Sequence, residues 1–196
     1  RQRLGSSPER TAVRTGPLEL VEVVRTLVIE DSEDGRRAQA AVAGLMDVVA
    51  GTSRVESGRI NDPSRKYPGD VCIRSATNAT IWEKAIEVRD KTISATDVRI
   101  FGMKCLAMGV REAAVVVVAE GQRPLDDAEL GVWAHNLGLG LTVFVGWEAF
   151  VHQALFWAPE PKPAAAALAV TMIHRRLVAV EASPKAIDLW LRLVSP

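Results

Sequence analysis

Two apolar runs separated by a helical segment constrain the fold of this chain more than any other feature. Residues 113–119 read AAVVVVA and residues 141–145 read LTVFV, and the segment 125–137 between them has helical spacing. Continuous apolar runs of this length are typical of strands buried on both faces. A strand, a helix and a second strand in this order indicate a crossover connection, and therefore parallel strands in an α/β sheet covered by helices.

The segments around this unit supply further helices and short strands. Apolar residues at helical spacing predict helices over 17–30, 36–50, 92–108, 147–157 and 164–181, with Pro184 beginning a last one. Short strands are expected within 55–60, 71–74 and 84–91. The expected fold class is α/β, with a mixed central sheet flanked by helices and extra helices at the C-terminus. We expect residues 1–16, rich in Arg, Gly and Ser, to be a flexible basic tail or linker, and residues 17–196 to be a single domain.

The composition excludes a strong overall attraction to nucleic acid or to a membrane surface. Lys and Arg number 24 and Asp and Glu number 24, so a DNA-binding protein of this composition must gather its basic residues on one face. No apolar run approaches the ~20 residues that a membrane span needs. Cys72 and Cys105 lie in apolar patterns, which is typical of buried thiols in a reduced, cytoplasmic protein. Because the chain begins at Arg1, we expect it to be part of a longer polypeptide.

The clearest sign of chemistry is a pair of acidic residues on two strands that are expected to form a hairpin. Centring the turn on residues 77–80 places Val71 opposite Ile86 and Asp70 opposite Glu87. Directly opposed residues share a face of the sheet, with their Cβ atoms ~5 Å apart. The alternation of the strands therefore predicts that the two carboxylates lie side by side on the face opposite to Val71 and Ile86.

Two carboxylates at this separation repel each other unless a cation lies between them. Oxygen ligands on rigid strands suit Mg²⁺, with Mn²⁺ as a second choice, and such a metal can activate a water molecule next to a phosphate. Arg89 and Lys91 are expected on the same face, where their charge favours phosphodiester hydrolysis. The simpler alternative makes Asp70 a turn residue and Glu87 a solvent-facing residue that pairs with Arg74 or Arg89.

The order of these motifs resembles the PD-(D/E)xK nuclease superfamily, whose core is a helix, three strands, a helix and a strand. Within that superfamily, residues 58–60 (GRI), 69–71 (GDV) and 87–91 (EVRDK), which lead into 96–98 (TDV), are similar to the SacI family of type II restriction endonucleases. The similarity covers roughly residues 35–145. It implies a restriction-endonuclease-like αβββαβ core and metal-dependent cleavage of double-stranded DNA. It also implies a homodimer, while the length and the start at Arg1 leave a place in a larger defence protein or assembly as the alternative expectation.

The resemblance assigns Asp70 and Glu87 as metal ligands and Arg89 as the third motif position, and Lys91, two residues on and expected on the same face, completes the expected catalytic group. The third position of the motif is usually Lys and is Arg89 here, and an arginine stays protonated and cannot act as a general base. Arg89 can still orient a water molecule or bind a phosphate, and Lys91 can supply an ammonium group. One alternative is a weakened or inactive nuclease fold that binds DNA or assembles with other proteins. Another is a small-ligand α/β domain, although no glycine-rich phosphate loop follows a strand.

Further candidate residues come from the basic loop before the hairpin and from the first two helices. Asn61, with the basic side chains of the loop, is a candidate for DNA contact, although a solvated loop is the alternative. The loop candidates are Arg59, Asn61, Arg65 and Lys66. Glu33 or Asp47 can add a carboxylate to the metal site, with a plain exposed position as the alternative.

Overall fold

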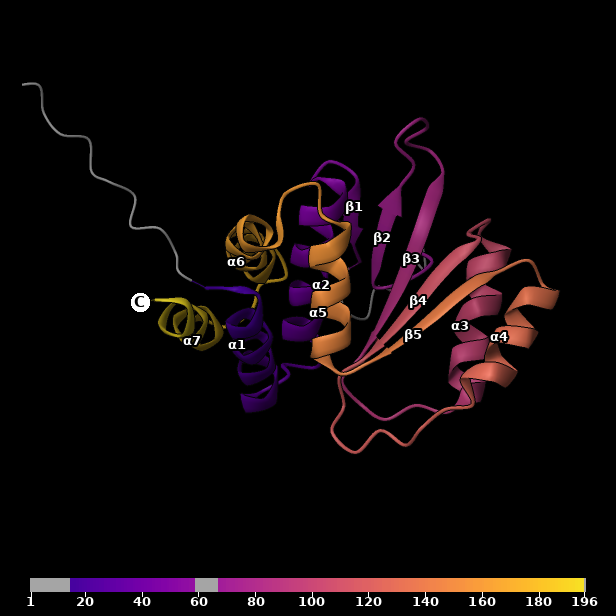
Figure 1. Cartoon of the computed structure of the whole chain (residues 1–196), viewed down its shortest axis with the longest axis horizontal. Helices are drawn as coiled ribbons and strands as arrows, with labels where there is room; N and C mark the ends of the chain where they lie inside the picture. The colour runs from indigo at the N-terminus through magenta and orange to yellow at the C-terminus, as the bar shows by residue number, and fades with distance from the viewer. Residues whose placement is uncertain (1–14, 59–66, 196) are drawn as a thin grey trace, which may run out of the picture.

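The central element of the computed structural model, which describes residues 15–58 and 67–195, is a five-stranded sheet whose strands lie in chain order (Figure 1). The elements are α1 (Pro17–Glu30), α2 (Arg36–Ala50), β1 (Val55–Ser57), β2 (Val71–Arg74), β3 (Trp82–Arg89), α3 (Ala95–Ala107), β4 (Glu112–Val117), α4 (Asp127–Asn136), β5 (Gly140–Val145), α5 (Trp147–Trp157), α6 (Lys162–Ala179) and α7 (Pro184–Val194). All but two residues of the expected basic tail, 1–14, lie outside the described residues.

The sheet is mixed, because its first half is built from hairpins and its second half from crossovers. β1 pairs with β2 and β2 with β3 in antiparallel fashion, whereas β3–β4 and β4–β5 are parallel. The parallel pairs are connected through α3 and α4, as the strand–helix–strand order predicts. The predicted α/β class with a mixed, helix-flanked sheet is confirmed.

The predicted register of the β2–β3 hairpin is confirmed where the two strands begin at the site. Val71 pairs with Ile86 and Ile73 pairs with Lys84. The register then shifts after Ile73, so that Arg74 pairs with Trp82 near the tip of the hairpin. Because this irregularity lies at the far end of the strands, it leaves the pairing next to Asp70 unchanged.

Helices cover both faces of the sheet, and the two faces carry separate apolar clusters. Figure 1 shows α1, α2, α5, α6 and α7 on one side and α3 and α4 on the other. Val71 and Ile86 point into the first layer, whereas Cys72 and Ala85 point toward α3 and α4. The alternation expected from the sequence thus decides which side chains of the hairpin face each layer.

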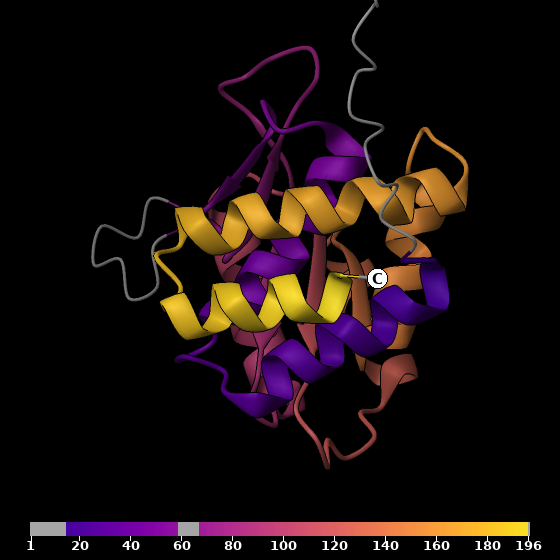
Figure 2. The same ribbon diagram turned by 90° about the vertical axis from the view of Figure 1, so that its left-hand side faces the viewer.

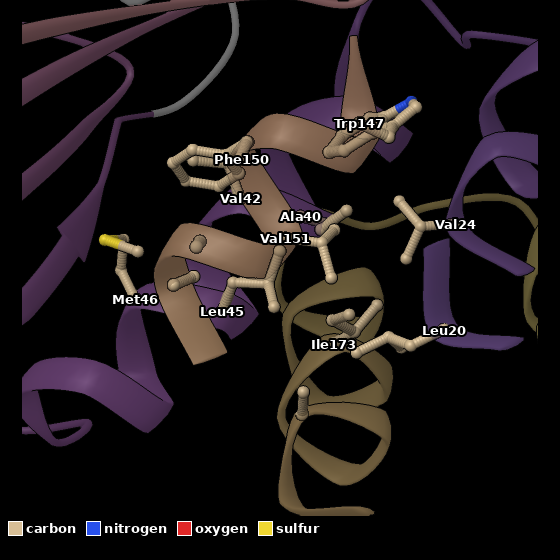
Figure 3. Close-up of a cluster of buried hydrophobic side chains, with 14 of the residues drawn as sticks. Leu20, Val24, Ala40, Val42, Leu45, Met46, Trp147, Phe150, Val151 and Ile173 are labelled. Carbon is tan, nitrogen blue, oxygen red and sulfur yellow. The ribbon is translucent and has the colours of Figure 1, made fainter. Parts of the chain in front are cut away.

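The larger core lies around α2, which is packed between the sheet and the C-terminal helices (Figure 3). Leu45 and Val42 of this helix are fully buried, and Ile173 of α6 lies against it. A Cβ atom at Gly44 would lie 2.6 Å from the backbone of Ile173, so only glycine permits this approach of α2 and α6. On the outer side, α1, α6 and α7 lie next to one another (Figure 2).

One expectation about the strands is wrong: β5 is not buried on both faces. It forms an edge of the sheet, and 51% of the surface of Val145 is exposed. An edge strand has one neighbour, and Thr142 also remains exposed. β4, which has a neighbour on each side, carries the buried residues that the AAVVVVA run predicts. None of the helices in the described ranges is both long enough and apolar enough to cross a membrane.

Candidate active site

A cleft of about 470 Å³ opens where the end of β3 meets the turn between α1 and α2. The hairpin side of the cleft is lined by Asp70, Glu87, Val88, Arg89, Asp90 and Lys91, and the helical side by Ser32, Asp34, Gly35 and Gln39. All four residues predicted as catalytic therefore line one cleft. The predicted DNA contacts Arg59, Asn61, Arg65 and Lys66 lie outside the described residues.

Asp70 is held in place through both its main chain and its side chain. It lies one residue before β2, at the position that continues the hairpin register to Glu87. Its Oδ2 accepts a hydrogen bond from the Val88 N–H (2.8 Å), and its carbonyl oxygen accepts one from the Gly58 N–H (3.1 Å). A Cβ atom at the preceding Gly69 would lie 2.7 Å from the Ile86 carbonyl oxygen, so glycine allows β3 to pass this close.

Glu87 projects from β3 and is largely withdrawn from solvent, with 15% of its side chain exposed. Its Oε1 lies 2.5 Å from an Arg89 guanidinium nitrogen. The alternative in which Glu87 faces solvent is therefore wrong, although its pairing with Arg89 is observed. Arg74 is engaged elsewhere, with Glu56 and over the ring of Trp82.

Both carboxyl groups are harder to ionise than usual, and the charge of Asp70 adds to this at Glu87. Burial raises the pKa of Asp70, although the Val88 N–H and the charges of Arg89 and Lys104 oppose this. Burial and the charge of Asp70 raise the pKa of Glu87 to about 7, against the same two cations. Near neutral pH the pair therefore tends to retain a proton, and a divalent cation can replace that proton.

The donor set of the cleft fits a hard divalent cation. Asp70 and Glu87 offer carboxylate oxygens from adjacent strands, and such oxygens are the protein ligands that Mg²⁺ prefers. Within 15–58 and 67–195 no group of three or more His, Cys, Asp and Glu side chains is placed to hold a metal. A metal at this pair would consequently keep several water ligands, as Mg²⁺ usually does.

Lys104 is a basic residue of the site that the sequence reasoning missed. It lies in the last turn of α3, and its charge lowers the pKa of both Asp70 and Glu87. The signal in the sequence was its place next to Cys105, which lies with Val98 and Phe101 on the buried face of the helix. Lys104 is itself exposed, so it acts on the two carboxyl groups through its charge and not by being buried beside them.

Lys91 lies beyond the end of β3, since the strand ends at Arg89. Its exposed side chain lines the rim of the cleft. The strand alternation that was expected to place Lys91 on the same face as Glu87 stops at Arg89, two residues earlier. Arg54, which begins the basic loop, bonds to the Arg74 carbonyl and to Glu83. This arginine therefore braces the hairpin.

Glu33 does not add a carboxylate to the site, and it is not exposed either. It accepts hydrogen bonds from the Ser183 N–H (3.0 Å) and hydroxyl (2.6 Å) and pairs with the fully buried Arg37 (2.8 Å). Burial alone would raise the pKa of Glu33, but the bonds from Ser183 and Arg37 lower it. This network ties the turn that lines the cleft to the start of α7.

Asp47 is also neither a metal ligand nor exposed. Its carboxylate forms a two-point ion pair with Arg176 of α6, with 2.6 Å between Oδ2 and Nε, and only 2% of its side chain is exposed. Arg176 also donates to the Val55 carbonyl. The polar residue in the apolar pattern of α2 thus joins α2, α6 and β1.

The two cysteines lie near the carboxylates, on the side of the sheet that faces α3. Both thiols are free and buried, as the sequence predicts. Burial raises the pKa of Cys72 and of Cys105 to about 12. These thiols are therefore protonated and unreactive in the folded protein.

Comparison with known proteins agrees with the resemblance seen in the sequence. No model of a protein family matches the chain. The type II restriction enzyme SacI of Streptomyces achromogenes is 25% identical to it over 194 residues, which are 97% of this chain and 53% of that enzyme. The chain thus spans about half the length of this relative. The similarity supports a restriction-endonuclease-like relationship that extends over nearly the whole chain.

Proposed function

We propose that this chain is a metal-dependent deoxyribonuclease domain of restriction or defence type, with a PD-(D/E)xK site, that hydrolyses phosphodiester bonds in double-stranded DNA. The observation that carries the proposal is the pair of Asp70 and Glu87, which face one open cleft and are both hard to ionise. The similarity to a type II restriction enzyme supports the same reaction. Neither a His-based triad nor a glycine-rich phosphate loop is needed to explain this cleft.

In this proposal Asp70 and Glu87 hold Mg²⁺ or Mn²⁺. The metal supplies a bound water of lowered pKa and neutralises charge at the phosphate. Arg89 fixes the orientation of Glu87 through their ion pair, and it cannot take up a proton. Lys91 lines the rim of the cleft, and the charge of Lys104 of α3 acts on both carboxyl groups. An ammonium group near the cleft would stabilise the negative charge of a scissile phosphate.

A second candidate function is a DNA-binding or assembly module that no longer cuts. The observation in its favour is the contact between Arg89 and Glu87, because the guanidinium occupies Oε1, one of the oxygens that a metal would use. The two candidates differ in whether a metal can displace Arg89 from Glu87. Measured cation binding and cleavage decide between them.

The test is incubation of the protein with plasmid DNA and Mg²⁺ or Mn²⁺. Asp70→Asn and Glu87→Gln remove the charge of each proposed ligand with little change in shape. Glu83→Gln is the matched control, since Glu83 lies on the same strand but pairs with Arg54 away from the cleft. The proposal expects cleavage by the unaltered chain and by the control, and none by the other two variants.

Cleavage that persists in Asp70→Asn would overturn the assignment of the site. DNA binding without cleavage, in a protein that binds no Mn²⁺, would favour the second candidate. Double-stranded DNA, a homodimer or larger defence assembly, and a cytoplasmic location belong to the same proposal. Sedimentation with and without a DNA duplex tests the dimer, since a two-fold enzyme on a two-fold site should bind one duplex per two chains.

A further inference from the structure

Gln39 is a buried polar residue at the wall of the cleft, and the proposed reaction assigns it no role. It lies in α2, only 3% of its surface is exposed, and it lines the cleft together with Asp70 and Glu87. A buried amide in an apolar helix face is costly unless its polar atoms are bonded. Its hydrogen bonds therefore show what it is fixed to.

The side-chain nitrogen of Gln39 is bonded to two main-chain carbonyl groups. Nε2 donates to the Gly58 carbonyl (2.6 Å) and to the Asp70 carbonyl (3.1 Å). Because both partners are acceptors, only the NH₂ end of the amide can face them, and this determines its orientation.

These bonds converge on the main chain of the residue that carries the first carboxylate. The Asp70 carbonyl accepts from Gln39 Nε2 and from the Gly58 N–H, while its Oδ2 accepts from the Val88 N–H. Asp70 precedes β2 and has no ladder partner of its own in the hairpin. Gln39 thus ties this residue to α2, which is packed in the centre of the larger core.

We propose that Gln39 is a positioning residue of the site, which holds Asp70 so that its carboxylate and that of Glu87 face one cation. The amide fixes the main chain of Asp70 from the helical side. The proposal rests on the proposed metal site, but its first test needs neither metal nor DNA.

The first test is hydrogen exchange of the Val88 amide in the metal-free protein. In Gln39→Met, which keeps the volume and removes the donors, we expect this exchange to be at least about tenfold faster, because Asp70 no longer holds its acceptor in place. Val115, in the centre of the sheet, should keep its exchange rate. Unchanged exchange at Val88 overturns the proposal.

A second variant keeps the test decisive if Gln39→Met does not fold. Gln39→Asn keeps an amide but shortens the side chain by one methylene, so that the amide nitrogen can no longer bridge both carbonyl groups. We expect the same selective acceleration at Val88 in this variant. Exchange that accelerates equally at Val88 and Val115 would mean a general loss of stability and would contradict a positioning role.

The second test is calorimetric titration with Mn²⁺. Gln39→Met should weaken the affinity about tenfold, a factor typical of outer partners that orient metal ligands. Gln153→Met on α5 is the matched control and should bind Mn²⁺ as the unaltered chain does. Leu177→Ala, which removes buried volume in α6, is the control for stability: it should unfold more easily without losing affinity for Mn²⁺. If Gln39→Met binds normally while Asp70→Asn does not bind, the positioning role fails and the metal site stands. If the unaltered chain binds no Mn²⁺, both fail.

Discussion

The carboxylate of Asp70 accepts a hydrogen bond from the main-chain N–H of Val88, across the point where the β2–β3 ladder ends. One of its oxygens therefore completes the hairpin, while the side chain also lines the cleft. The same carboxylate has a structural task and a proposed chemical task. Substitutions of Asp70 that keep or remove the oxygen bonded to Val88 can separate the structural task from the chemical one.

Asp70→Asn and Asp70→Ala should differ in stability but not in activity. Both remove the proposed metal ligand, so neither should cleave DNA. Asparagine keeps an oxygen for the Val88 N–H, whereas alanine leaves this group without its partner, at a cost of about 1–3 kcal/mol. Urea unfolding in metal-free buffer measures the difference. Equal stability of the two variants would show that the hydrogen bond contributes little.

Glu87 should make the metal-free protein less stable as the pH rises. Its pKa is about 7 in the folded chain and near 4.5 when unperturbed, so between these values the folded state binds a proton that the unfolded state has released. The free energy of unfolding therefore falls from pH 4.5 to 7, by on the order of 1–3 kcal/mol. Glu87→Gln should abolish this slope and be the more stable protein at pH 8. Chemical denaturation at a series of pH values with chelator checks it, and a variant that keeps the slope would assign it to another group.

Loss of Lys104 should raise the pKa of Glu87 and slow the reaction. Because its charge lowers the pKa of Glu87, Lys104→Met should raise that pKa further, which is measurable by carboxyl NMR. We also expect kcat to fall by about 10²-fold, in the range seen when one stabilising group is lost. Lys162→Met at the exposed start of α6 is the control. Normal cleavage by Lys104→Met would remove this residue from the proposed site.

Breaking the ion pair between Asp47 and Arg176 should be among the most destabilising changes in the molecule. Asp47→Ala leaves a mostly buried guanidinium without its carboxylate, which costs about 3–5 kcal/mol. Replacing both residues, by Leu and Met, should recover much of this loss, since apolar side chains of similar volume can fill the site. Thermal unfolding of the two single variants and the double variant measures the coupling. Additive losses would mean that the pair does not act as a unit.

The thiols of Cys72 and Cys105 should be unreactive until the protein unfolds. Burial raises both pKa values to about 12, so almost no thiolate exists at neutral pH. A chromogenic disulfide reagent should therefore label them at the rate of unfolding, and in urea at once. Rapid labelling of the native protein would contradict the burial of these residues.

The sequence predicts the hairpin well because its information is local. The turn residues at 77–80 and the alternation of Val71, Ile73 and Ile86 determine which residues pair, since a shift of one residue would expose the apolar set. Helix ends were equally legible where Pro17 begins a helix and Gly51 ends one. The position of Asp70 next to Glu87, one residue before the observed pairs begin, follows from these local rules.

Lys104 and Gln39 could not be assigned to the site in the same way, because they come from helices on opposite faces of the sheet. Their positions depend on how α3 and α2 are rotated against the strands, and that rotation is set by packing between distant segments. The edge position of β5 was also hidden, because an apolar run such as LTVFV looks the same in an edge strand and in a central one. Only the strand order distinguishes the two.

The burial of α2 under α5 and α6 has a consequence for synthesis of the chain. This helix is made early, yet the segment that covers it, with Ile173 against Gly44, is made more than a hundred residues later. On the ribosome, the apolar surface of α2 therefore stays uncovered until α6 has emerged. A chain interrupted after β5 would contain the whole hairpin and both proposed metal ligands, but it would expose this surface and tend to aggregate.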